Sequence, residues 1–278
     1  MQTAEHMLRT GRRGALHEFS MAFGDLRASM GMLSLAWTLA WHDVVSRYRG
    51  SILGPFWITL SMGFMVLGIG FLYSELQHIS LKDTMPFVAL GIVFWGMISQ
   101  VIIEGCDTFV HAAGMLSQTS LPMFTFLWRT VLRNLVTLSH HLIIIVAVIV
   151  AYGFWRTMDL PMALVGILLT LINVSWISLA AAIGSARFRD IPQIVMSVMQ
   201  FSMFMTPVFW NPVSRAGMMK TVLDLNPFFH MLDSIRTPLL GGHCEPLSYQ
   251  VLIIMGIVGW AATFSMFAMT RRRIVHYL

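Results

Sequence analysis

Charged residues divide the chain into long stretches that carry no charge at all. Six of these charge-free runs are each 20 to 27 residues long: 50–74, 84–103, 134–155, 160–186, 191–214 and 246–270. About 20 apolar residues in a helix cross the roughly 30 Å of hydrocarbon in a bilayer, whereas membrane-crossing strands need only about 9–11 alternating residues. The runs therefore predict an all-α polytopic membrane protein with six transmembrane helices.

A seventh charge-free run, 108–128, is excluded as a span by its polarity and by the distribution of positive charge. It carries His111, Ser117, Gln118 and Ser120, which are costly to bury in lipid. With six spans and a cytoplasmic N-terminus, 13 of the 18 Lys and Arg residues are cytoplasmic, whereas counting 108–128 as a span leaves only 10. Because Lys and Arg concentrate in cytoplasmic loops, we expect both termini and the loop 104–130 to be cytoplasmic.

Two further segments are unusual for a simple helical bundle. Residues 28–42 are apolar but too short to span, and Trp37 and Trp41 recur at helical spacing. This pattern predicts an amphipathic helix in the cytoplasmic membrane interface. The outer segment 206–245 combines several prolines with the amphipathic stretch LDLNPFFHMLDSI. It predicts short re-entrant helices, which are tolerated only where protein or water surrounds the backbone.

The composition excludes several classes of function. Only 11% of the residues are charged, against about 25% in a soluble domain, and the net charge of +5 is distributed as expected for a membrane surface and not a nucleic-acid partner. The chain has no G-x-x-x-x-G-K-[ST] loop, and Cys106 and Cys244 form no metal or redox motif. We therefore expect no catalytic residue, metal or cofactor in this chain, and any transport energy must come from a partner.

Four stretches resemble one known family: RYRGSILGPFW, LPMFTFLWRTVLRN, SARFRDIPQIVMSVMQFSMFMTPVFW and LNPFFHMLDSIRTPLLG. With the order of the expected elements, residues 25–273 resemble the permease subunit of ABC-type polysaccharide exporters, in particular the O-antigen exporter permease. The resemblance implies a homodimer in the bacterial inner membrane, bound to two copies of a separate ATPase that binds ATP and Mg. The substrate would be an undecaprenyl-pyrophosphate-linked polysaccharide used in lipopolysaccharide biosynthesis.

Other interpretations of the same pattern stay open. Capsule, teichoic-acid and drug exporter permeases share the architecture, and an intramembrane acyl or glycosyl transferase is a further alternative that the charge-free spans disfavour. In the exporter interpretation, the chain comprises a cytoplasmic tail (1–24), an interfacial helix with an entrance loop (25–53), the permease domain (54–273) and a cytoplasmic C-terminus (274–278).

The resemblance gives the loop before the first span a role in recognising the substrate head group. The expected residues are Arg47, Tyr48, Arg49, Gly50, Ser51, Leu53, Gly54 and Pro55. Arginine offers paired donors that suit pyrophosphate, and glycine permits a close approach of the backbone. The alternative is that these arginines only anchor the helix in anionic lipid.

Aromatic residues on two expected spans are candidates for lining a glycan path. Trp57, Phe64 and Phe71 repeat every seven residues on the first span, and Phe201, Phe204 and Trp210 form a second set. Their rings would allow sliding contacts with the apolar faces of sugars. The alternative is ordinary helix packing or contact with lipid.

The loop 111–124 is the expected coupling element. A short cytoplasmic helix there would sit in a groove on the ATPase and transmit its motion to the spans, and the alternative is a plain surface loop. The candidate residues are His111, Met115, Leu116, Ser117, Gln118, Ser120 and Pro122.

Overall fold

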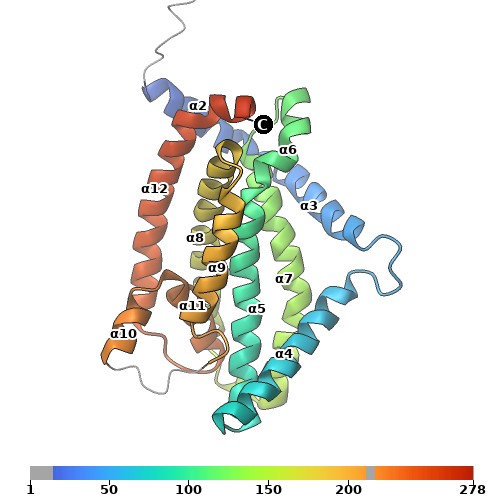
Figure 1. The fold of residues 1–278 in the computed structure, drawn as a ribbon, viewed down its shortest axis with the longest axis vertical. Coiled ribbons are helices and arrows are strands. Elements are labelled where there is room, and N and C mark those ends of the chain that lie inside the picture. Colours follow the sequence, from blue (N-terminus) through green and yellow to red (C-terminus); the bar gives the residue numbers. More distant parts are fainter. Residues whose placement is uncertain (1–14, 211–216, 278) are drawn as a thin grey trace, which may run out of the picture.

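The structure of the chain is a computed structural model that describes residues 15–210 and 217–277. Within these ranges the secondary structure is helical and contains no β-strand. The elements shown in Figure 1 are α2 (Ala15–Met30), α3 (Leu33–Arg47), α4 (Phe56–Gln77), α5 (Leu81–Cys106), α6 (Thr108–Gln118), α7 (Phe124–Tyr152), the 3-10 turn η1 (Phe154–Arg156), α8 (Leu160–Arg187), α9 (Ile191–Met205), α10 (Gly217–Asp224), α11 (Pro227–Leu239) and α12 (Pro246–Tyr277).

Five of the described helices are long and apolar enough to cross a membrane: α4, α5, α7, α8 and the part of α12 up to Ile274. In the run 191–214, expected as a further span, the residues that the structure describes, up to Trp210, contain the 15-residue apolar helix α9. At 1.5 Å per residue this helix is about 22 Å long, which is less than the roughly 30 Å of bilayer hydrocarbon. It ends at Met205 because Thr206, which precedes Pro207, is extended.

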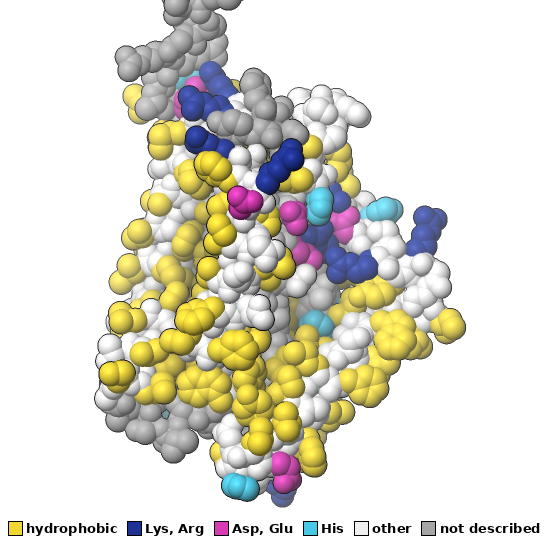
Figure 2. Space-filling model, viewed as in Figure 1, with side chains coloured by type: hydrophobic (Ala, Val, Ile, Leu, Met, Phe, Trp, Pro, Cys, Tyr) yellow, Lys and Arg dark blue, Asp and Glu magenta, His cyan; other side chains and the backbone are white. Residues whose placement is uncertain are grey.

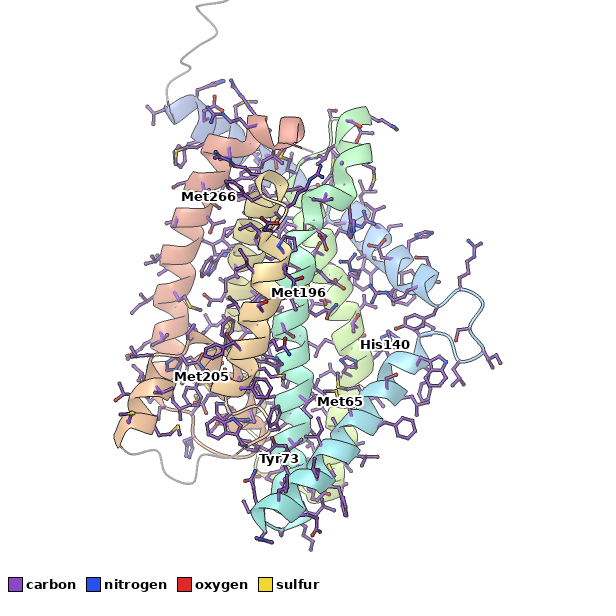
Figure 3. The ribbon with its side chains drawn as sticks, in the orientation of Figure 1. Met65, Tyr73, His140, Met196, Met205 and Met266 are labelled. Carbon is purple, nitrogen blue, oxygen red and sulfur yellow. The ribbon has the colours of Figure 1, made fainter. Side chains whose placement is uncertain are left out.

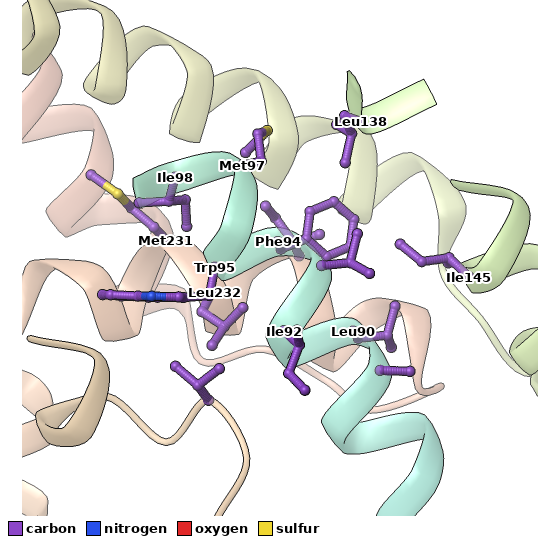
Figure 4. Packing of buried hydrophobic residues seen from close by; sticks show 14 of the residues in the cluster. Leu90, Ile92, Phe94, Trp95, Met97, Ile98, Leu138, Ile145, Met231 and Leu232 are labelled. Atoms are coloured by element: carbon purple, nitrogen blue, oxygen red, sulfur yellow. The ribbon is translucent and has the colours of Figure 1, made fainter. Parts of the chain in front are cut away.

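Helix α5 is the central element of the bundle. Its buried side chains include Phe94, Trp95 and Ile98, and it packs against α4, α7, α8, α9 and α11. Figure 4 shows Leu138 and Ile145 of α7 on one side of this helix and residues of α11 on the other. A continuous apolar core therefore holds the long helices together around α5.

The N-terminal helix α2 is fastened across the end of the bundle that holds the C-terminal end of α12 (Figure 1). Its Asp25 carboxylate accepts hydrogen bonds from the backbone N–H groups of Met123 and Phe124, each at 3.1 Å. Arg271 of α12 lies 3.4 Å from the same carboxylate. The last part of the expected tail, from Ala15 onward, is thus a helix that ties the start of α7 to the end of α12.

The expected interfacial helix, 28–42, is divided between the end of α2 and the first part of α3, with a turn at Gly31 and Met32, and α3 packs against α7. Ala36, Ala40 and Val44 form its buried side, whereas Trp37 and Trp41 are about half exposed and stack with ring centroids 6.4 Å apart. Helices α3 and α4 form a V whose tip projects from the side of the bundle (Figure 1). Where α4 crosses α7, the Thr59 hydroxyl donates to the carbonyl of His140 at 3.0 Å (Figure 3).

The opposite end of the bundle is closed by α11, which packs against α8 and α12. The Asn226 side chain accepts from the backbone N–H groups of Phe228 and Phe229 and so caps the helix. Arg236 is buried and donates to the carbonyl of Pro207 at 2.7 Å. The expected re-entrant segment 206–245 therefore contains two short helices, α10 and α11, while 211–216 lie outside the described residues.

Candidate functional site

Three arginines and two carboxylates meet where α3, α5 and α7 come together, and we call them the charge cluster: Asp43, Arg47, Glu104, Arg129 and Arg133. Arg129 donates to both carboxylate oxygens of Asp43, from Nε at 2.8 Å and from Nη2 at 2.6 Å. Arg133 joins the two carboxylates, at 3.2 Å from Asp43 and at 2.6 and 2.9 Å from Glu104. The Arg129–Asp43 pair is bidentate, and such pairs are strong and fix geometry, whereas both donors of Arg133 reach the single oxygen Oε2 of Glu104.

The local sequence explains how these side chains converge. Each helix contributes a pair of polar residues four positions apart, which lie on one face of an α-helix. The pairs are Asp43 and Arg47 on α3, Gln100 and Glu104 on α5, and Arg129 and Arg133 on α7. The packing of α7 against both α3 and α5 then brings the three pairs together.

The charge cluster is largely shielded from solvent and carries an excess of positive charge. Asp43, Glu104, Arg129 and Arg133 have side chains that are 14% to 19% exposed, whereas that of Arg47 is 57% exposed. Burial raises the pKa of the Asp43 carboxyl, but the hydrogen bonds and charges of Arg129 and Arg133 outweigh burial and hold that pKa below its usual value. Because three arginines face two carboxylates, one positive charge remains unbalanced.

Two cavities adjoin the charge cluster. The first has a volume of about 350 Å³, lies between α3, α6 and α7, and includes the side chains of Ser46, Thr108 and Thr130 in its wall. The second, of about 230 Å³, lies between α4, α5 and α7. Arg47 and Glu104 line both cavities. Figure 2 shows charged side chains gathered on this part of the surface, above a mostly hydrophobic lower region.

The structure separates the residues expected at the entrance into two groups. Arg47 lies in the charge cluster. The loop from Tyr48 to Pro55 forms the tip of the V, where Arg49 and Ser51 are exposed. Gly50 and Gly54 have φ angles of +84° and +55°, a left-handed conformation that favours glycine. The expected loop geometry is therefore present, but the loop residue Arg49 does not line either cavity.

The sequence interpretation missed Asp43, Glu104, Arg129, Arg133 and Asn134 as members of a site. Asn134 is buried and donates to Glu104 at 2.9 Å. A signal was available, because all five lie at the ends of charge-free runs and each has a charged or polar neighbour four positions away. What the pattern does not contain is the packing that brings three separate helices together.

The expected channel aromatics are prominent on the surface of this chain. Trp57, Phe64, Phe71, Phe201 and Phe204 are between 44% and 66% exposed, so they do not fill the core of one chain. The aromatic sets on α4 and α9 nevertheless approach one another at one point, through Tyr73 and Phe209 with centroids 5.0 Å apart and Phe209 and Phe204 at 6.4 Å. Trp210 donates from its ring nitrogen to the carbonyl of Phe204 at 3.3 Å.

The expected coupling loop is helical over α6, which projects at the same end of the bundle as α2 and the C-terminal end of α12 (Figure 1). His111, Ser117, Gln118 and Ser120 are exposed, Met115 and Leu116 are half-buried, and Pro122 is buried. The hydroxyls of Thr108 and Thr130 lie 3.0 Å apart and tie the base of α6 to α7. His111 also lines the 350 Å³ cavity, so α6 directly adjoins the charge cluster.

Comparison with known proteins gives two kinds of similarity. Residues 34–240 match the family described as ABC-2 type transporter. The chain is 23% identical over 201 residues to "O-antigen export system permease protein RfbA" of Myxococcus xanthus, covering 72% of this chain and 77% of that protein. It is 18% identical over 240 residues to the protein of the same name from Klebsiella pneumoniae, covering 85% of this chain and 92% of that one.

Proposed function

The chain belongs to the ABC-2 type transporter family, and on that premise we propose that it is the permease subunit that exports a lipid-linked polysaccharide of the O-antigen type. The observation that carries the proposal is the similarity to two O-antigen export permeases over 72% and 85% of the chain. The five long apolar helices supply a membrane-embedded body for such a subunit. The chain lacks a nucleotide-binding loop, which accords with an ATPase supplied by another chain.

We place the permease in the bacterial inner membrane with six crossings and with α2, α6 and both termini in the cytoplasm. The sixth crossing is assigned to α9 with the described residues that follow it, up to Trp210, because α9 runs from the α6 end of the bundle toward the α11 end (Figure 1). In support, Arg236 of α11 bonds to Pro207, just beyond α9. The arginine-rich segments at the α6 end agree with the excess of positive charge in cytoplasmic loops.

The proposed assembly is a homodimer of the permease with two copies of a cognate ATPase. The exposed aromatic residues of α4 and α9 support a path for the glycan between the two permease copies, since they remain uncovered within one chain. The projecting helix α6 is the proposed contact with the ATPase. Its exposed residues Ser117 and Gln118 would meet the ATPase, while the base of the helix is anchored to α7.

The first experiment is a measurement of ATP hydrolysis in the reconstituted complex. The chain is purified with its cognate ATPase, placed in lipid vesicles and exposed to undecaprenyl-pyrophosphate-linked glycan. We expect the glycan to change the hydrolysis rate, and the lipid carrier without glycan or a lipid-linked teichoic acid to change it less. A complex whose hydrolysis responds equally to all three would contradict the polysaccharide assignment, and failure to recover any ATPase would contradict the transporter proposal itself.

The same assay tests the entrance. We expect the double variant Arg47→Ala/Arg49→Ala to lose the response to the lipid-linked glycan while keeping basal ATP hydrolysis. An unchanged response would show that these two arginines only anchor the helix in lipid.

A further inference from the structure

We propose that the two cavities whose walls share Arg47 and Glu104 form a binding site for a diphosphate group, and that Asp43 and Glu104 compete within the protein for the same arginines. This inference rests on the proposed function only in taking a lipid-linked diphosphate as the source of the group. It assigns recognition of the substrate head group to the shielded charge cluster instead of the exposed loop at the tip of the V. It also gives the two carboxylates a regulatory role.

The donors of the charge cluster are suited to an anion with several oxygens. In the structure the paired donors of Arg129 are engaged by the Asp43 carboxylate, and two donors of Arg133 are engaged by Glu104. Phosphate oxygens fit the same planar fork as carboxylate oxygens. Asp43 and Glu104 therefore occupy the positions that phosphate oxygens would take when bound.

Arg47 is the arginine that is available without displacement. Its Nη2 atom lies 3.6 Å from Glu104, which is an ion-pair distance but too long for a hydrogen bond. Its side chain is also the most exposed in the cluster, at 57%. An arriving anion can therefore contact Arg47 first and then compete with Glu104 for Arg133.

The cavities provide the space and polarity that such a group requires. The first, at about 350 Å³, falls within the range of small-molecule sites and adds the polar side chains of Ser46, Thr108 and His111 to the arginines. The second continues along α5 and α7 with Gln100, Asn134 and Thr137. Met62, Met97 and Leu138 also line it, so its wall includes apolar side chains suited to the first part of a prenyl tail.

A diphosphate can engage more of the arginine donors in the charge cluster than a singly charged group can. One unbalanced positive charge is enough for a monoanion at Arg47, but it leaves Arg129 and Arg133 neutralised by the carboxylates. A diphosphate has enough oxygens to contact Arg47 and the donors of Arg133 together, and a Glu104 released from Arg133 keeps its hydrogen bonds from Gln100 and Asn134. The occupied site then differs from the empty one in the contacts between α3, α5 and α7.

The opposing interpretation is that the cluster is only a structural clasp between α3, α5 and α7. The two interpretations predict different effects on diphosphate binding when Glu104 is neutralised. A clasp that loses Glu104 leaves Arg133 partly unpaired and destabilises the fold without creating a ligand site. A binding site that loses its internal competitor takes up the diphosphate more tightly.

The test is direct binding to the purified full-length chain in nanodiscs of zwitterionic lipid. The probes are farnesyl diphosphate, farnesol and inorganic pyrophosphate, measured by isothermal titration calorimetry. The variants are Arg47→Ala, Glu104→Gln and the matched control Arg49→Ala, which removes a neighbouring arginine that lines neither cavity. No ATPase and no glycan are required, so the result is independent of the proposed export activity.

We expect wild type to bind farnesyl diphosphate and not farnesol. Arg47→Ala loses a charge-assisted contact, so we expect it to bind farnesyl diphosphate about tenfold more weakly. Glu104→Gln loses the competing carboxylate, so we expect its affinity to rise about threefold or more. Arg49→Ala should stay within about twofold of wild type. If Glu104→Gln does not fold, Arg47→Ala still tests the proposal. The Arg47 side chain is mostly exposed, so we expect this variant to fold.

Two results would overturn the proposal. Equal affinities of wild type and Arg47→Ala would show that the cluster does not hold the diphosphate. Weaker binding by a folded Glu104→Gln would show that Glu104 supports the site and does not compete for it. Inorganic pyrophosphate binding as tightly as farnesyl diphosphate would support the diphosphate site and assign the group to a soluble diphosphate instead of a lipid. Binding as expected, with no effect of glycan on ATP hydrolysis, would leave the diphosphate site standing and contradict the polysaccharide assignment alone.

Discussion

At the scale of single residues, the setting of Cys244 predicts an unreactive thiol. Its Sγ atom lies 3.2 Å from the Asp233 carboxylate, and burial, followed by the charge of Asp233, raises the pKa of the thiol to about 12. Because the thiolate is the nucleophile, we expect maleimide to label Cys244 at pH 7.5 more than about 100-fold more slowly than an ordinary thiol of pKa near 8.5. The matched control is Ser51→Cys in a Cys244→Ser chain, on the exposed loop of the V. Equal rates of labelling at the two positions would contradict this account, and the rate at Cys244 should rise continuously up to at least pH 10.

At the scale of elements, the close approach of α5 to the chain after α9 depends on Gly91. A Cβ atom at this position would collide with the backbone carbonyl of Val208, whereas one at Gly68 of α4 meets no atom within 4 Å. We expect Gly91→Ala to lower the free energy of unfolding by about 1–3 kcal/mol, as overpacking does, and Gly68→Ala to lower it little or raise it slightly. Thermal unfolding in detergent, followed by tryptophan fluorescence, measures both. If the two variants melt at the same temperature, the segment around Val208 is not held against α5 as described.

The elements also show which parts of the molecule the sequence could predict. Charge-free runs located the five long helices, because the absence of charge is a direct consequence of burial in lipid. The run 191–214 was a weaker guide, since hydrophobicity continues past the point where Pro207 ends α9. Arg47 was predicted as a site residue, but its partner Glu104 and Arg133, which also pairs with Glu104, were not. Their meeting depends on how α3 and α5 pack against α7, and no pattern within one helix specifies that packing.

At the scale of the whole molecule, the two ends of the bundle are built from different parts of the chain, and this predicts the membrane topology. Arg271 and Arg272 pair with Asp25 and Glu18, so the end of α12 and the helix α2 lie at the same end, together with α6. α11 packs at the other end, separated by α8, whose 28 residues extend about 42 Å.

Reporter fusions test this arrangement because alkaline phosphatase is active only outside the cytoplasm and green fluorescent protein fluoresces only inside it. We expect phosphatase inserted after the exposed His243 to be active, and phosphatase inserted after Gln118 or fused after residue 277 to be inactive, with the reverse pattern for fluorescence. An active phosphatase after residue 277 together with an inactive one after Gln118 would place two segments from the same end of the bundle on opposite sides of the membrane. Since the contacts of Asp25 and Glu18 with α12 forbid that separation, such a result would require a different packing of α2. Active phosphatase at both other sites but not after His243 would instead show that the orientation is reversed. The proposed ATPase contact would then lie outside the cytoplasm.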